Sequence, residues 1–233
     1  VDIYGPSVPT LFRAPHPDVY MKEQMILPVV VDGLKTMSLG YLMGDQPAVM
    51  RGPMVSNYTM QMLRQTAWGD LDYLIIDLPP GTGDIQLTLV QQASIDGAVI
   101  VTTPQALSLV DVARGIQMFE KVNVPVLGIV ENMAYFVCDQ CEKKHFIFGN
   151  SAATLKERFG LNTLAQLPIM PGVSDTSKLD SGADVGLFAE LAENLHREVG
   201  KRRLAGDEKP VVEAEKGRVV VRWPDGTESR IAN

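Results

Sequence analysis

Short apolar runs alternate along most of the chain with longer stretches in which apolar residues recur every three or four positions. The runs at residues 73–76, 98–101 and 126–130 are apolar throughout, as in strands that are buried on both faces of a parallel sheet. A further strand is predicted at residues 164–169. The stretches between the runs have the spacing of helices that pack by one face.

The predicted helices follow the predicted strands in regular alternation. Ser56, Asp84 and Thr103 are predicted as N-caps, because their side-chain oxygens can accept hydrogen bonds from free amides at a helix start. This alternation predicts an α/β fold with a doubly wound, mostly parallel sheet and flanking helices. The helices are expected at residues 56–67, 84–93, 105–121, 151–159 and 187–203.

Both ends of the chain differ from this regular part. Two short apolar segments, at residues 26–31 and 36–42, flank Asp32-Gly33, a turn signal typical of hairpins. Residues 134–150 show no clear period and are expected to form an elaborated loop. We predict a main domain over residues 1–204. It is followed by a charged linker over 205–210 and by a fragment of a small β-containing domain over 211–233. Its first hairpin is expected to turn at residues 224–226.

Composition narrows the function classes. The 233 residues are 45% hydrophobic and 21% charged, with a net charge of -7 and a pI near 5.0. Such an acidic balance argues against a nucleic-acid footprint and against attachment to anionic membranes. No apolar run is long enough to span a bilayer and no signal-peptide pattern is present, so the cytoplasm is the expected compartment. The cysteines, Cys138 and Cys141, suit a metal or redox pair in a reducing compartment.

Asp77 is the first candidate for chemistry. It directly follows the apolar run 73–76 and precedes Pro79, Pro80 and Gly81, which cannot continue a strand. Ligands of parallel α/β sheets sit beyond the carboxyl ends of the strands. A carboxylate there is placed to hold a metal ion or to orient a water molecule; the alternative is that it caps a turn.

Several motifs occur in an order that resembles a known family. They are DIYGPS at 2–7, RGPM at 51–54, DYLIIDLPPGTGD at 72–84, TTPQ at 102–105, ENM at 131–133, the two cysteines and IFG at 147–149. Together they resemble the Mrp/NBP35 family of iron–sulfur cluster carrier ATPases, in the MinD-like deviant-Walker class of P-loop NTPases, over about residues 1 to 200. More weakly, WPDGTESR at 223–230 is similar to the opening of a small domain often fused behind such ATPases.

The resemblance implies roles for individual residues. Asp77 matches the Walker B carboxylate that holds the water shell of Mg²⁺, and Gly81 matches a switch glycine that senses the γ-phosphate of ATP. Asp2 matches the aspartate that orients the attacking water. Asn132 matches the asparagine that reads the adenine edge, with the backbone around Pro168 closing the base pocket. From the residues alone, the alternative for Asn132 is a polar cap on a strand end.

The cysteines supply only part of a cluster site. A [4Fe–4S] cluster is held by four cysteine thiolates, and this chain has two. The resemblance implies that two protomers each contribute two, so that the cluster bridges a homodimer. Half of a zinc site, a redox dithiol and two incidental cysteines remain alternatives. His145 lies four residues beyond Cys141, but a Cys–Cys–His zinc site would lack a fourth ligand, so we treat His145 as ordinary, like His16 and His196.

The phosphate loop of such ATPases has no counterpart here. The sequence contains no G-x-x-x-x-G-K-[ST] motif, and the chain begins with Val1. We expect a complete protein that binds and hydrolyses ATP and passes clusters from assembly scaffolds to apo iron–sulfur proteins. The chain as given is expected to be N-terminally truncated, to lack a central strand and to be inactive as an ATPase. The competing hypotheses are a MinD/ParA-type regulatory ATPase and a pseudo-ATPase that holds zinc between protomers.

Overall fold

The computed structural model describes residues 1–2, 7–14, 18–43, 52–79, 81, 83–149, 152–170, 185–204, 211–215, 218–222 and 228–231. The helices are α1 Ser7–Leu11, α2 Leu39–Met43, α3 Gly52–Arg64, α4 Asp84–Gln92, α5 Ala106–Lys121, α6 Ala152–Phe159 and α7 Val185–Leu204. The strands are β1 Met21–Lys22, β2 Met25–Ile26, β3 Val29–Val31, β4 Leu34–Thr36, β5 Ala98–Thr102, β6 Val126–Glu131, β7 Phe136–Val137, β8 Lys144–His145, β9 Thr163–Gln166, β10 Val211–Glu215, β11 Arg218–Arg222 and β12 Glu228–Ile231.

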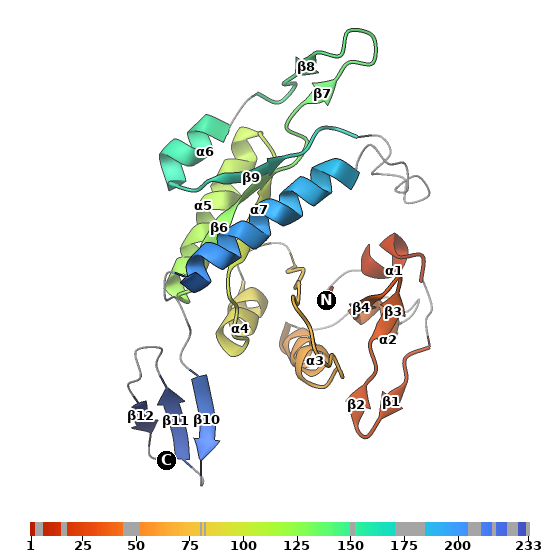
Figure 1. Ribbon diagram of the computed structural model, residues 1–233, viewed down its shortest axis with the longest axis vertical. Helices are drawn as coiled ribbons and strands as arrows, with labels where there is room; N and C mark the ends of the chain where they lie inside the picture. The colour runs from red at the N-terminus through yellow and green to blue at the C-terminus, as the bar shows by residue number, and fades with distance from the viewer. Residues whose placement is uncertain are drawn as a thin grey trace.

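A parallel sheet of β5, β6 and β9 forms the centre of the larger half of the chain. Strand β6 lies between the other two, and all six of its residues are buried. Ile129 packs in a core with α4 and α5, whereas its neighbour Val130 packs with β9 and α7. Helices α5 and α7 therefore cover opposite faces of the sheet (Figure 1). The predicted doubly wound α/β fold is confirmed.

Gly128 lets β9 approach the centre of β6. A Cβ atom at this position would lie 2.7 Å from the Leu164 side chain and 2.8 Å from the carbonyl oxygen of Asn162. The register of β6 against β5 shifts next to this glycine, and its register against β9 shifts between Ile129 and Val130. The close approach of two backbones thus depends on the missing side chain.

Some of the described residues between Val8 and Trp68 form a separate small core. Met37, Leu39, Tyr41 and Met62 are buried there against partly buried apolar residues of α1, β2 and β3. Strands β3 and β4 pair across Asp32 and Gly33, whose φ values of 49° and 82° lie in the left-handed region. The predicted hairpin turn is confirmed, but residues 39–43 of the second predicted segment form helix α2 instead of strand.

Residues 73–76 do not form a buried strand, contrary to the sequence prediction. Ile75 is 73% exposed, and Tyr73 and Leu74 are exposed as well. In the described part of the chain, this segment pairs with residues 1–2: the Val1 amino group donates to the Ile75 carbonyl at 2.7 Å. A strand is buried on both faces only when other elements, usually helices, cover both faces of its sheet, and the exposed side chains show that this segment lacks such cover in the described part of the chain.

Helix starts also differ from the predicted N-caps. Helix α3 begins at Gly52, so Ser56 lies inside it, and the N-caps of α4 and α5 are Gly83 and Gln105 rather than Asp84 and Thr103. The Thr103 hydroxyl instead lies 2.8 Å from the Ser108 hydroxyl. Several residues near each start can accept a backbone N–H, so composition alone does not select among them.

The C-terminal strands β10, β11 and β12 form an antiparallel three-stranded sheet. The predicted small domain over residues 211–233 stays a prediction; the linker at 205–210 and the turn at 224–226 lie outside the described residues. Across the described helices, none combines the length and apolar character needed to cross a membrane.

We expect Gly128→Ala to lower the free energy of unfolding by about 1 to 3 kcal/mol, because the added methyl group overpacks the contact between β6 and β9. Gly200→Ala in α7 is the matched control, since nothing lies within 4 Å of its Cβ position. There alanine should raise stability by about 0.5 to 1 kcal/mol, the usual gain in a helix interior. Urea unfolding followed by circular dichroism measures both, and equal effects would contradict the close approach.

Candidate functional site

Asp2 lies between two segments that are distant in the sequence. It forms parallel bridges with Ser38 on one side and Asp77 on the other, and its backbone bonds to residues 37 and 39. The side chain is 3% exposed. Its Oδ2 accepts hydrogen bonds from the Val8 N–H and the Ser38 hydroxyl, each at 3.2 Å. The carboxylate is thus held in one orientation beside Asp77.

Asp77 stands at the end of the extended segment, next to Asp2. Its N–H donates to the Val1 carbonyl at 2.8 Å. Desolvation by the surrounding chain and the nearby Asp2 carboxylate raise the pKa of Asp77, and the Val1 ammonium opposes this rise. Two carboxylates this close repel each other when both are ionised, and a divalent cation would relieve that repulsion.

The loop after Asp77 is supported by a residue that sequence reasoning did not single out. Gln86, on the first turn of α4, is 5% exposed, and its Nε2 donates to the Pro79 carbonyl at 3.1 Å. Gly81 has a φ of 100°, a conformation that favours glycine. An amide-bearing residue soon after a glycine-proline loop is a weak signal, since a helix start offers several such positions.

Asn132 directly follows the carboxyl end of β6, and Pro168 lies two residues beyond the end of β9. The Asn132 N–H donates to the Thr102 carbonyl at 2.7 Å, and its Oδ1 accepts from the Met133 N–H at 2.9 Å. The latter contact is the one expected of a polar cap on a strand end. Pro168 is buried, and its neighbour Leu167 is bonded to both Glu131 and Ala134.

Glu131 is a buried carboxylate that the sequence prediction passed over. It is 0% exposed, and its Oε2 accepts a hydrogen bond from Gln166 Nε2 at 2.6 Å. This charge-assisted contact joins the ends of β6 and β9 directly before Asn132. The signal that could have found it is the one used for Asp77: an acidic residue immediately after an apolar strand.

The two cysteines stand at the tip of a hairpin where a loop was expected. Strands β7 and β8 pair with Phe136 opposite His145, and the Cys138 N–H donates to the Lys143 carbonyl at 3.1 Å. The hairpin projects from the carboxyl-end side of β6 (Figure 1). Both thiols are free, Cys138 half-buried and Cys141 exposed. Backbone N–H groups of Gln140 and Cys141, and then the Cys141 side chain, lower the pKa of Cys138.

His145 belongs to this group of side chains. One ligand atom from each of Cys138, Cys141 and His145 lies within 4.8 Å of the others. Sequence reasoning treated His145 as ordinary, because a Cys–Cys–His zinc site would lack a fourth ligand. The strand pairing that brings His145 to the cysteines cannot be read from sequence spacing, since a two-residue strand gives no visible period.

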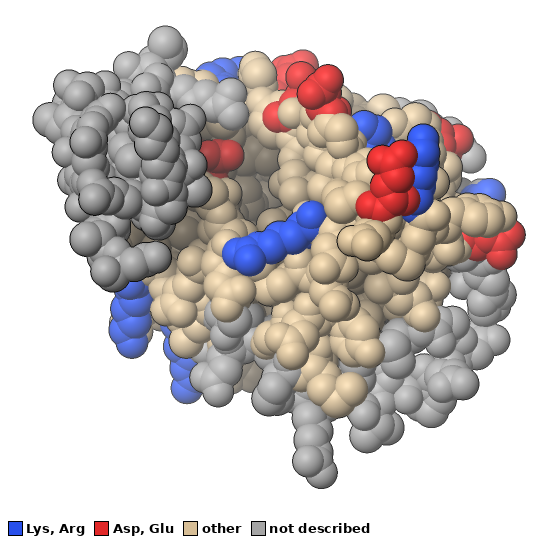
Figure 2. Space-filling view, turned by 90° about the horizontal axis from the view of Figure 1, so that it is seen from below, with Lys and Arg blue, Asp and Glu red and all other residues tan. Residues whose placement is uncertain are grey.

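Charged side chains do not form one continuous field on the face seen in Figure 2. Lys and Arg lie scattered there, several of them next to Asp or Glu. The described part of this face therefore offers no continuous basic surface of the kind that binds nucleic acid.

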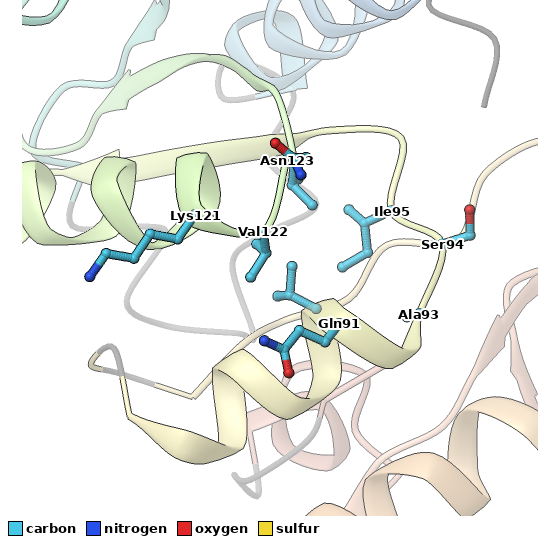
Figure 3. A pocket seen from close by; sticks show the side chains of 9 residues that line it. Gln91, Ala93, Ser94, Ile95, Lys121, Val122 and Asn123 are labelled. Carbon is cyan, nitrogen blue, oxygen red and sulfur yellow. The ribbon is translucent and has the colours of Figure 1, made fainter. Parts of the chain in front are cut away.

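A pocket of about 440 Å³ lies away from the candidate residues. It is lined by the end of α4, the connection to β5 and the end of α5, including Gln91, Ile95, Lys121 and Asn123 (Figure 3). These segments lead into the amino-terminal ends of β5 and β6, whereas Asn132 and the hairpin follow the carboxyl end of β6. The pocket is thus separate from the candidate site.

The parallel sheet with helices on both faces, and the two acidic residues Asp2 and Asp77 brought side by side, agree with the α/β fold of P-loop NTPases. Residues 1–199 match the family model described as NUBPL iron-transfer P-loop NTPase, ParA. The chain belongs to this family, and the resemblance inferred from the sequence motifs is confirmed.

Similar proteins are known from several organisms. The chain is 50% identical over 184 residues to the iron–sulfur cluster carrier protein of Escherichia coli, covering 78% of this chain and 49% of that one. It is 47% identical over 180 residues to the carrier of Aquifex aeolicus, covering 76% and 50%. The chain spans about half the length of these curated relatives. A nucleotide-binding protein from Archaeoglobus fulgidus, solved with ADP and Co, is 37% identical, with a TM-score of 0.68 over 80% of this chain and 76% of that one.

In the reduced, metal-free protein we expect Cys138 to react with iodoacetamide down to a lower pH in the folded chain than in the urea-unfolded chain. A lowered pKa keeps the thiolate, the reactive form, populated at lower pH. The Cys141→Ala variant should keep most of this difference, because backbone N–H groups outrank the Cys141 side chain among its causes. Peptide mapping by mass spectrometry measures the pH profile, and identical profiles in both states would contradict the proposed N–H···S contacts.

Proposed function

We propose that this chain is part of an iron–sulfur cluster carrier that holds a [4Fe–4S] cluster between two protomers and transfers it to apo-proteins. The observation that carries the proposal is the position of Cys138 and Cys141, two free thiols at the tip of a projecting hairpin. Family membership supports it, because the similar proteins of Escherichia coli and Aquifex aeolicus are named iron–sulfur cluster carriers.

The donor set fits one half of such a site. Two thiolates at the tip of a hairpin can face a second copy without movement of the core, and two copies together supply the four thiolates that the cluster requires. A symmetric site also explains why the thiols are accessible rather than packed in the interior.

Apolar side chains next to the thiols support a homodimer. Val137, Phe146, Ile147 and Phe148 are between 40 and 61% exposed around the hairpin. Exposed apolar residues that cluster at one place commonly mark an interface. A second copy placed against this surface would bring its own cysteines to the first pair.

For the nucleotide, we propose the roles that the motifs suggest. Asp77 would hold the water shell of Mg²⁺, Asp2 would orient the attacking water, and Gly81 would sense the γ-phosphate. Asn132 and the backbone near Pro168 would receive the adenine. Support comes from the pairing of Asp2 with Asp77 and from the Archaeoglobus fulgidus protein, which was solved with ADP. ATP hydrolysis would belong to a polypeptide that also carries a phosphate loop.

Partners follow from this role. A carrier receives clusters from assembly scaffolds and gives them to apo iron–sulfur proteins, and free thiols suit the reducing cytoplasm. No specific observation favours the alternative of a regulatory MinD/ParA-type ATPase. The grouping of His145 with the two cysteines bears on the alternative of a zinc-holding pseudo-ATPase, but it lies within one chain rather than between protomers. The domain limits at residues 204 and 211 stay predictions.

Anaerobic reconstitution with iron and sulfide should give a brown dimer with about four irons per pair of chains. Cys138→Ser and Cys141→Ser should each abolish the colour and the dimer that depends on it. His196→Ala, a substitution outside the hairpin, is the control and should keep full iron. Iron and sulfide analysis with size-exclusion chromatography gives the readout; either cysteine variant retaining full iron would refute the bridging cluster.

We expect residues 1–233 alone to show no binding of Mg-ATP in equilibrium dialysis, because the sequence has no G-x-x-x-x-G-K-[ST] loop to cradle the phosphates. Binding of Mg-ATP by residues 1–233 would contradict the expectation that the phosphates need this loop.

A further inference from the structure

The pairing register of the cysteine hairpin places His145 on the same face as Cys138. Phe136 pairs with His145, and Cys138 follows Phe136 by two residues. Side chains two apart on a strand point to the same face, and diagonal neighbours on that face can reach each other. The ladder continues toward the turn, where the Glu142 N–H donates to the Cys138 carbonyl at 2.8 Å. A histidine at position 144 or 146 would face the other side.

The three side chains are close to the spacing of a tetrahedral metal site. Their ligand atoms all lie within 4.8 Å of one another. Around a zinc ion with bonds of about 2.3 Å to sulfur and 2.0 Å to nitrogen, tetrahedral ligands are separated by about 3.5 to 3.8 Å. The difference is small enough for side-chain rotation alone, because Cys141 and His145 are exposed and Cys138 is only half-buried.

The chemistry of the set suits one divalent cation. Two thiolates neutralise a 2+ charge, and a neutral imidazole adds a third ligand without further charge. Two sulfurs and one nitrogen favour Zn²⁺ and its spectroscopic substitute Co²⁺ over Mg²⁺ or Ca²⁺, which prefer oxygen. Among the described residues, no fourth His, Cys, Asp or Glu belongs to the group, so one position would be left to water.

We propose that a single chain binds one Zn²⁺-like ion through Cys138, Cys141 and His145, with an open fourth position. This goes beyond the cluster proposal, because it requires neither a second copy nor a nucleotide. The same two thiolates cannot hold the ion and a bridging cluster together. Zinc would therefore compete with cluster loading and keep that loading from proceeding.

Anaerobic titration of the reduced full chain with Co²⁺ tests the site. We expect the visible bands of tetrahedral cobalt and thiolate-to-cobalt charge transfer in the near ultraviolet, saturating at one Co²⁺ per chain. His145→Ala should weaken binding by at least about tenfold, comparable to the loss of a group that supports a metal ligand. His196→Ala should bind as the unchanged protein does. Saturation at one Co²⁺ per two chains would overturn the proposal in favour of an ion shared between protomers.

A second variant separates loss of a ligand from loss of folding. His145→Cys supplies a thiolate from the same position, and it should restore tight binding with stronger charge-transfer absorption. If His145→Ala binds Co²⁺ as tightly as the unchanged chain, the proposal is wrong, whatever the cysteine variants do.

Iron reconstitution of His145→Ala distinguishes this proposal from the cluster proposal. Both cysteines remain in that variant, so it should take up full iron while losing cobalt affinity. Loss of iron as well would place His145 in the cluster site and overturn a role confined to the mononuclear ion. Zinc added before iron and sulfide should suppress cluster formation in the unchanged chain and much less in His145→Ala.

Discussion

The pairing of β6 with strands on both of its edges is the constraint on which the rest of the larger half depends. All residues of this strand are buried; Val126 and Ile129 enter one core, and Val130 enters another on the opposite face. Apolar burial on both faces fixes its position, since any slip by one residue would exchange the two sets. Asn132 and the connection to the hairpin directly follow the carboxyl end of β6. The position of this strand therefore fixes the positions of these candidate residues.

The acidic pair is organised differently. Asp2 is held between the segments at Ser38 and Asp77 by backbone bonds and by two hydrogen bonds to its own carboxylate. Tyr73 connects the same region to α7, where its hydroxyl bonds to His196 and the two rings meet edge to face with centroids 6.0 Å apart. The segment that carries Asp77 therefore links the region around Asp2 to helix α7.

Much of this fold could be predicted from the sequence. The run at 126–130 identified the central strand β6 because its burial leaves a continuous apolar pattern. The run at 98–101 identified its neighbour β5, although Val101 there is 66% exposed. Asp32-Gly33 identified a turn that needs positive φ. The exposure of Ile75 could not be predicted, because a run of apolar residues records which side chains suit burial and not which strands flank them. The position of His145 beside the cysteines could not be predicted, because it depends on the pairing register of the hairpin. The hydrogen bond of Glu131 could not be predicted either, because its partner Gln166 lies 35 residues away.

The cysteine hairpin is separate from the apolar cores, and this separation matters for the proposed carrier function. Its strands bond to each other, and its base is anchored by the Ile169 N–H, which donates to the Tyr135 carbonyl at 2.7 Å. No residue between 136 and 149 belongs to the core clusters found in the described part of the chain. In small metal-dependent domains the fold collapses when the metal leaves. For the carrier proposed above, loss of the cluster would leave these cores in place, so delivery and reloading would need no refolding step between them.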